Sequence, residues 1–234
     1  MYSLMRVVGE MKKHQLATVD FVKAADALTH ESFHGGIHLA ISEGLADMDP
    51  FIGKQAPVFF MYTFYGHMYS AQMRANKLFD THGNAVTVPK FLEMARLRRS
   101  KFQHAKEKDV LACIAEAESI IANLTPTIRV LRTRRSDFLA HISPKLAFTP
   151  EQLQQATKLT MPQIREVLYE GGKIVNQLLH MWNKSKNQLR ETFADDYKKI
   201  VSLASKQLCS EIKAHEAEFA KYDSRPLPRP RDCP

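Results

Sequence analysis

The residues best suited to chemistry lie in the segment TPTIRVLRTRRSDFLAHISP, residues 125–144. At 100° per residue, apolar side chains form one stripe along this segment, and Arg135 falls in the middle of the stripe. A guanidinium that faces a core or an interface is costly unless it pairs with an anion. The position of Arg135 therefore needs an explanation, either an anionic partner within the fold or a role in a functional site. The stripe consists of Ile128, Leu131, Phe138 and Ile142.

His141 lies in the last helical turn before Pro144. There the helix dipole favours the imidazolium form, which suits a residue that gives and takes a proton. Arg134 lies nearly on the same helical line as His141, about 20° away, whereas Arg135 lies about 120° away, which a long side chain can partly span. Both pairings stay open. A solvated basic helix that ends in a capping histidine is the alternative to a site.

The charge balance points to a polyanionic partner. Thirty-three basic and 25 acidic side chains give a net charge of +8. Such a surplus favours nucleic acid or a membrane surface, although a solvated basic face is the simpler reading. The densest basic cluster lies in the same segment and consists of Arg129, Arg132, Arg134 and Arg135.

Other kinds of site are not predicted. His30, His34 and His38 recur at steps of four, which would align three imidazoles on one helix for a metal ion. Gly35-Gly36 is expected to interrupt that helix, so no metal site is predicted. The sequence has no Walker-type phosphate loop and no dinucleotide glycine fingerprint. We therefore expect neither a metal nor a cofactor.

The elements that must position these residues are helices. Apolar residues recur at steps of three and four, without sustained period-two alternation, so we expect an all-α fold. Gly35-Gly36 is expected to end one helix, and Thr125-Pro126 to start a new one. Helices are predicted over residues 3–29, 37–45, 57–79, 87–97, 107–123 and 188–222, with further starts at Thr125, Thr149 and Thr160.

The chain is predicted to form one helical domain over residues 1–222, followed by a Pro/Arg-rich tail at 223–234 that is disordered or extended. The longest mostly apolar stretch, residues 57–69, is too short to span a bilayer. No signal segment opens the chain, and three cysteines without paired spacing predict reduced thiols. We therefore expect a soluble cytoplasmic protein that is not bound to a membrane.

An aromatic run covers more than one face of the helix predicted at residues 57–79. These rings could stack on bases, but a core helix or a dimer interface is the preferred interpretation. The run consists of Phe59, Phe60, Tyr62, Phe64, Tyr65 and Tyr69.

RSDFLAH, residues 135–141, resembles the Arg-x(4–6)-His signature of the HEPN superfamily, most closely its abortive-infection, AbiU-like branch. The resemblance extends to MRANKLFDTHGNAVTVPKFLEMA, residues 73–95, similar to a helix, an aspartate turn and a capped helix of that branch. Residues 146–182 resemble its C-terminal helix pair. Family members often carry Asn, Asp or His directly after the arginine, where this chain has Ser136.

The resemblance implies an antiparallel HEPN-like bundle with extra flanking helices that dimerises through its motif helices, around Ile128, Leu131 and Phe138. It also implies a metal-independent endoribonuclease of phage defence, or a toxin, with an antitoxin or another defence protein as a possible partner. Expected catalytic residues are Arg135 and His141, with Ser136 and Arg134 as secondary contributors; Arg129 and Arg132 are expected to bind RNA. A non-catalytic HEPN module that binds RNA or a protein is the alternative.

Overall fold

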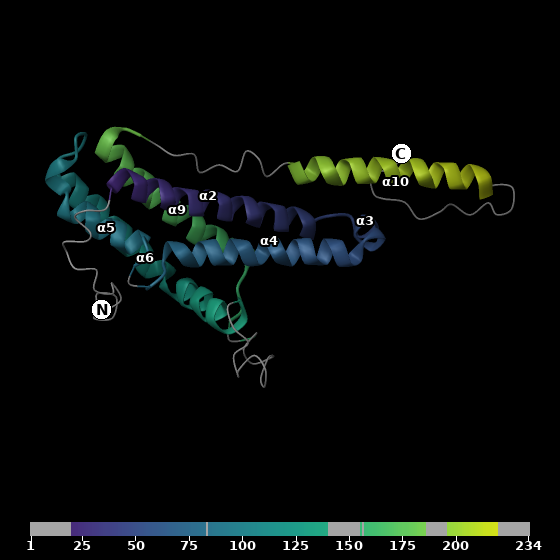
Figure 1. Cartoon of the computed structure of the whole chain (residues 1–234), viewed down its shortest axis with the longest axis horizontal. Coiled ribbons are helices and arrows are strands. Elements are labelled where there is room, and N and C mark those ends of the chain that lie inside the picture. The colour runs from purple at the N-terminus through teal and green to yellow at the C-terminus, as the bar shows by residue number, and fades with distance from the viewer. Residues whose placement is uncertain (1–19, 83, 140–154, 156, 186–195, 220–234) are drawn as a thin grey trace. The chain divides into compact units, whose positions relative to one another are not determined.

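The structure, a computed structural model, describes residues 20–82, 84–139, 155, 157–185 and 196–219 (Figure 1). These residues form helices and contain no strand, which confirms the all-α prediction. The elements are α2 (Phe21–Ala46), α3 (Pro50–Gln55), α4 (Pro57–Leu78), α5 (Val88–Leu97), η1 (Arg99–Lys101), α6 (Glu107–Arg134), η2 (Arg135–Leu139), α9 (Met161–Asn183) and α10 (Asp196–Phe219).

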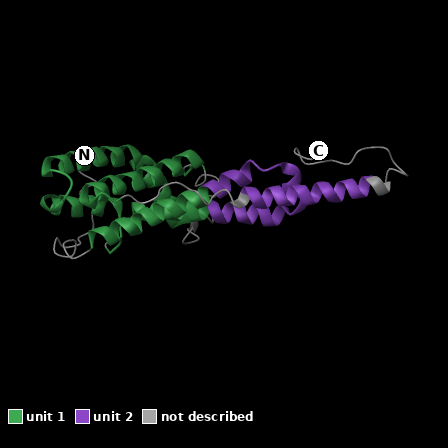
Figure 2. Cartoon of the chain, turned by 90° about the horizontal axis from the view of Figure 1, so that it is seen from above, with its two compact units in different colours: residues 1–39, 69–191 green, residues 40–68, 192–234 purple. Residues whose placement is uncertain are grey.

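The chain divides into two compact units (Figure 2). Unit 1 comprises residues 1–39 and 69–191, and unit 2 comprises residues 40–68 and 192–234. Because the boundaries fall inside α2 and α4, each of these helices contributes to both units. The tail predicted at residues 223–234 lies outside the described residues, and the single domain over 1–222 stays a prediction.

The core of unit 1 is the contact between α6 and α9, with α5 packed against both. The buried residues of α6 recur at steps of three and four, as expected for one face of a helix. They are Val110, Ile114, Ala117, Ile121, Leu124, Ile128 and Leu131. The facing residues of α9 include Ile164, Val167, Leu168, Ile174, Val175, Leu178 and Leu179.

An aromatic cluster joins α2, α5 and α9 at one end of this core. The Phe21 ring stacks on Phe91, with ring centroids 4.4 Å apart, and lies 4.6 Å from Trp182. Phe102 meets Trp182 edge-on at 5.1 Å. These offset and edge-to-face geometries are the favoured ones for aromatic pairs. The cluster fixes the first turn of α2 against the rest of unit 1.

The predicted break at Gly35-Gly36 is wrong, because α2 continues through both glycines. A Cβ at position 35 would lie 2.4 Å from Leu168 Cδ2 and 3.3 Å from Arg74 Cβ. One turn earlier, Ser32 Oγ donates to the Leu168 carbonyl at 2.7 Å. Gly35 therefore allows α2 to approach α9 closely, and this packing outweighs the low helix propensity of glycine.

The predicted start at Thr125-Pro126 is wrong as well, because α6 runs through Pro126. A proline inside a helix costs about 3 kcal/mol. Leu124 and Ile128 on either side of it are buried, and Thr125 Oγ1 donates to the Ile121 carbonyl at 2.9 Å. Burial of this apolar face keeps the helix continuous across the proline.

Several other predicted boundaries agree closely with the structure, while the helix start at Thr149 and the limits at residues 3, 188 and 222 lie outside the described residues. Helix α4 ends one residue before the predicted limit, and α5 begins after Thr87 as expected. Helix α9 begins at a capping box, in which the Thr160 side chain accepts from the Gln163 amide and Gln163 Oε1 accepts from Thr160 N. These boundaries depend on local sequence, which explains why they are predictable.

Two findings bear on the expected cellular setting. No helix among the described residues is long and apolar enough to cross a membrane. Cys113 is free, whereas Cys209 is disulfide-bonded, so the expectation that all the thiols are reduced is wrong for Cys209.

Candidate functional site

Arg135 forms an ion pair with the turn that follows α4. Arg135 begins η2, a π-helical turn that follows α6 directly. Its Nη1 donates to Asp80 Oδ2 at 2.6 Å, and the two side chains are 39% and 15% exposed. The other N–H groups of this guanidinium have no hydrogen-bond partner among the described residues. Among the residues that the structure describes, Asp80 thus engages one edge of the Arg135 guanidinium and the rest of the group has no partner. Short π-helical turns often occur at functional sites.

The Asp80 carboxylate is fixed by its own backbone turn. Asp80 Oδ1 accepts from the His82 amide at 3.2 Å. Burial acts to raise the pKa of Asp80, but the His82 and Thr81 amides and the Arg135 guanidinium together lower it below its ordinary value. Asp80 is therefore ionised at neutral pH and presents a negative charge to Arg135.

Lys90 organises the connection that carries Asp80. It is a lysine of α5, and only 2% of its surface is exposed. Its Nζ donates to the His82 carbonyl at 2.8 Å and to the Ala85 carbonyl at 2.9 Å. Burial lowers the pKa of Lys90, and the charge of Asp80 opposes that shift. The ammonium therefore ties the turn after α4 to the start of α5.

Two neighbouring arginines face the interior of unit 1. Arg134 Nε donates to Gln72 Oε1 at 2.8 Å, and its Nη1 donates to the Thr157 carbonyl at 3.2 Å. Arg132 Nη2 donates to the Phe79 carbonyl at 2.8 Å. Burial lowers the pKa of both guanidinium groups. Both arginines thus join the end of α6 to the end of α4.

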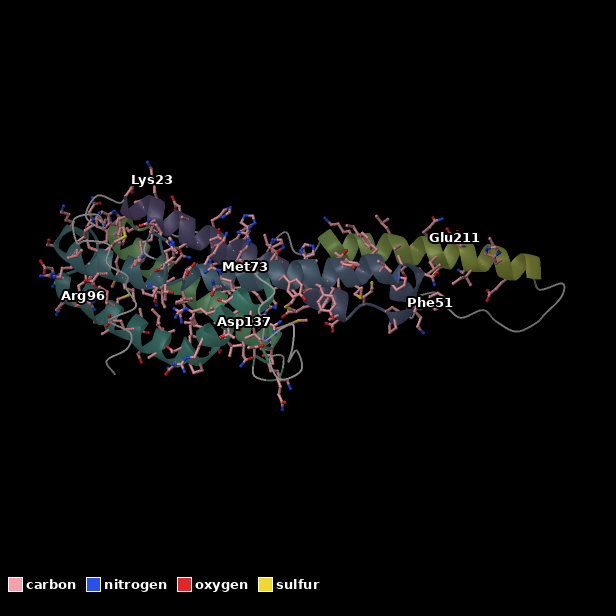
Figure 3. All side chains as sticks on the ribbon, turned by 60° about the horizontal axis from the view of Figure 1, so that its bottom comes forward. Lys23, Phe51, Met73, Arg96, Asp137 and Glu211 are labelled. Carbon is pink, nitrogen blue, oxygen red and sulfur yellow. The ribbon has the colours of Figure 1, made fainter. Side chains whose placement is uncertain are left out.

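Gln72 and Asn76 lie one turn apart on one face of α4, and Asp80 follows in the turn after the helix. Gln72 accepts from Arg134 and Asp80 accepts from Arg135. Asn76, between them, is buried, and neither polar atom of its amide has a hydrogen-bond partner in the part of the chain that the structure describes. In Figure 3, Met73 marks this part of α4 and Asp137 marks η2.

The structure brings together only part of the predicted site. Ser136, which follows Arg135 directly, is exposed. Arg129, earlier on α6, is exposed as well. Arg132 and Arg134 are half-buried and make the contacts described above. His141 lies outside the described residues, so its pairing with either arginine stays a prediction.

The dimer contact expected on the motif helix involves residues that the chain already covers. Ile128 and Leu131 are buried within unit 1, and the Phe138 side chain lies outside what the structure describes. The dimer around these residues therefore stays a prediction.

Sequence reasoning missed Gln72, Asn76 and Lys90 as parts of this region and noted Asp80 only as part of a turn. A signal was present for two of them. Gln72 and Asn76 are polar side chains spaced by one turn, and each follows an alanine, Ala71 or Ala75, that fits the apolar face of the helix. Nothing local in the sequence distinguishes the buried Lys90 from a surface lysine.

The histidines of α2 share one face because the helix is continuous. The rings of His30 and His34 lie 4.2 Å apart. Burial lowers the pKa of His34, as do the nearby His30 and Arg74, against the opposing charge of Glu31. Within the described ranges, no group of three or more potential ligands could hold a metal ion.

A comparison with protein-family models identifies the family of the chain. Residues 50–202 match the model of the AbiU2 HEPN domain. This range includes α4, the Asp80 turn, Arg135 and α9, and it covers well over half of the sequence. No curated protein and no solved structure matches the chain. The match confirms the resemblance and accounts for the all-α architecture, and the chain therefore belongs to the AbiU2 family of HEPN domain proteins.

Proposed function

We propose that this protein is a metal-independent endoribonuclease of the HEPN type that acts in phage defence or as a toxin. The observation that carries the proposal is that the Arg135 guanidinium is paired on one side and exposed on the other. Asp80 holds one edge of the guanidinium at 2.6 Å, while the side chain is 39% exposed. A guanidinium oriented in this way can offer further N–H groups to the oxygens of a phosphate.

The reaction follows from the two residue types of the motif. The 2′-hydroxyl of the substrate RNA loses its proton and attacks the adjacent phosphorus, while the bond from phosphorus to the 5′-oxygen breaks. His141 transfers protons, and Arg135 stabilises the negative charge that develops on the non-bridging oxygens. Ser136 and Arg134 are secondary contributors. The exposed Arg129 contacts the RNA backbone, and the charge of the half-buried Arg132 attracts that backbone at longer range. Cleavage leaves a 2′,3′-cyclic phosphate on one product.

A non-catalytic module that binds RNA or a partner protein is the second candidate. The ion pair favours it in one respect, because Asp80 already compensates the charge of Arg135, as it would in a purely structural pair. In this case, an antitoxin or another defence protein would be the partner that matters. The two candidates differ in one outcome, the cleavage of RNA.

The test is a cleavage assay on total RNA in EDTA with wild type, His141→Ala, Arg135→Ala and Arg135→Lys. We expect His141→Ala to abolish cleavage and to retain most RNA binding. Arg135→Ala should weaken both, and Arg135→Lys should restore little, because an ammonium lacks the planar fork. His104→Ala, which changes an exposed histidine outside the site, is the control.

The outcomes separate the candidates. Full activity of His141→Ala would rule out the proposed mechanism. Binding of RNA by the wild type without cleavage would favour the non-catalytic module. A thermal melt of each variant is needed, so that loss of activity is not confused with loss of the fold.

A further inference from the structure

The carboxamide of Asn76 is buried without a hydrogen-bond partner. Only 2% of the Asn76 surface is exposed, and neither Nδ2 nor Oδ1 has a partner within the described ranges. Such a group destabilises a fold, because it loses its hydrogen bonds to water and gains none in the protein. Native structures contain few groups of this kind, so the Asn76 amide needs an explanation.

A complementary group lies close to Asn76. The half-buried Arg132 donates through Nη2 to the Phe79 carbonyl at 2.8 Å. The Phe79 amide in turn donates to the Asn76 carbonyl at 3.1 Å, so the guanidinium lies about one helical turn from Asn76. Arg132 Nε is itself buried without a partner among the described residues. A buried donor, Nε, and a buried acceptor, Asn76 Oδ1, are thus both unpaired at the end of α4.

Gln72 shows the same kind of contact in its paired form. It lies one turn before Asn76 on α4 and is 4% exposed. Its Oε1 accepts from Arg134 Nε at 2.8 Å. A hydrogen bond from an arginine Nε of α6 to an amide oxygen of α4 is therefore made at Gln72 and is not made at Asn76.

Asp80 connects Arg132 to the candidate site. It forms the ion pair with Arg135, and it also acts on Arg132, because burial lowers the pKa of Arg132 and the charge of Asp80 opposes that shift. A phosphate that binds Arg135 brings a second negative charge close to Asp80, and so changes the attraction on Arg132. The arginine side chain has several rotatable bonds, so a change of rotamer is sufficient to give Nε a new acceptor.

We propose that Asn76 is a positioning residue, whose Oδ1 accepts from Arg132 Nε when RNA is bound. Arg132 and Arg135 lie three residues apart, about one helical turn, so a hydrogen bond that holds Arg132 also holds Arg135 in place. The new bond is made only in the complex, and it therefore adds to the affinity for RNA. This inference rests on the proposed function in one respect, the binding of RNA, and does not depend on cleavage.

The first measurement is the thermal unfolding of the full chain without RNA. Asn76→Leu replaces the amide by an apolar group of similar shape, and its Tm should equal or exceed that of the wild type, because no hydrogen bond is lost. Gln72→Met is the matched control and should lower the Tm by about 3–6 °C, because Arg134 Nε loses its acceptor. An equal fall in Asn76→Leu would show that its amide already has a partner, such as a buried water, and would overturn the proposal.

The second measurement is the affinity for an RNA oligonucleotide in EDTA, in the non-cleaving His141→Ala background. Asn76→Leu should weaken binding by about 10-fold, because a hydrogen bond to a charged group is lost. In an Arg132→Met background the same substitution should change the affinity by less than about 2-fold, because Asn76 then has no donor to accept from. Equal losses in the two backgrounds, or an unchanged affinity of Asn76→Leu, would overturn the proposal.

The outcomes separate this inference from the proposed function. The predicted loss of affinity in Asn76→Leu, together with a wild type that binds RNA without cleaving it, would reject the ribonuclease and support the role of Asn76. Cleavage by the wild type, together with unchanged binding by Asn76→Leu, would reject the role of Asn76 alone. A wild type that does not bind RNA would overturn both.

Discussion

The ion pair between Arg135 and Asp80 has a measurable energetic weight. Fully exposed pairs contribute about 0–1 kcal/mol, and hydrogen bonds to charged groups about 1.5–3 kcal/mol. The contact is short, at 2.6 Å, and the side chains are 39% and 15% exposed, so it falls between these classes. We expect a coupling free energy of about 1–2 kcal/mol.

A double-mutant cycle measures this coupling. Asp80→Ala, Arg135→Ala and the double variant are unfolded with urea at neutral pH, and the free energies of unfolding are compared. The pair between Arg99 and Glu107, at 3.1 Å and about half exposed on both sides, is the control and should couple by about 0.5 kcal/mol or less. A coupling of Arg135 and Asp80 no larger than in this control would refute the claim that Asp80 fixes Arg135.

Three further predictions concern the packing and the electrostatics around the site. Gly35→Ala should lower the free energy of unfolding by about 1–2 kcal/mol, because the new Cβ would meet Leu168. Gly66→Ala, which has open space around it, should raise the free energy of unfolding by about 0.5–1 kcal/mol. Unfolding of both variants in urea measures the two effects. Lys90→Met should lower the free energy of unfolding by about 1–3 kcal/mol, because two carbonyls lose their donor. Lys77→Met removes a half-exposed pair with Glu31 and should lower it by less than about 1 kcal/mol. Equal effects of the two substitutions would contradict the structural role of Lys90. Because the pKa of Asp80 is lower in the folded chain than in the unfolded chain, where it is near 4, ionised Asp80 stabilises the fold at higher pH. This contribution is lost as the pH falls through the pKa of the folded chain. The difference in melting temperature between wild type and Asp80→Asn should therefore be constant from pH 5 to 7 and shrink below about pH 4; a difference that persists at pH 3 would argue against it.

The helices that the sequence predicts well are those whose ends are determined locally. The Thr160 capping box and the Thr87 cap can be read from a few neighbouring residues, and the structure has a helix beginning after each. Local signals failed at Gly35 and at Pro126. At both positions, burial against another part of unit 1 outweighs the propensity of a single residue.

The candidate site was predictable only in part. The place of Arg135 within an apolar stripe indicates that it needs an anion, and the structure provides Asp80. The identity of that anion was not predictable, because the two residues are 55 positions apart and meet only in the folded chain. The same holds for Arg134, whose partner Gln72 is 62 positions away.

The aromatic run of α4 shows the limit of pattern reasoning. A core helix or a dimer interface was expected there. The exposure of Phe59 and Tyr62 excludes the core for that face of the helix, while Phe64 on the other face is half-buried. Periodicity places residues on faces, but it does not tell which face a neighbouring element will cover.

The central claim is that this chain cleaves RNA by attack of a 2′-hydroxyl with the help of Arg135 and His141. The most direct measurement uses an RNA oligonucleotide that the wild type cleaves at one position, compared in EDTA with the same oligonucleotide carrying a single 2′-deoxy nucleotide on the 5′ side of that bond. We predict cleavage of the first with a 2′,3′-cyclic phosphate end and no cleavage of the second at that bond. Equal cleavage of both at that bond would contradict the account.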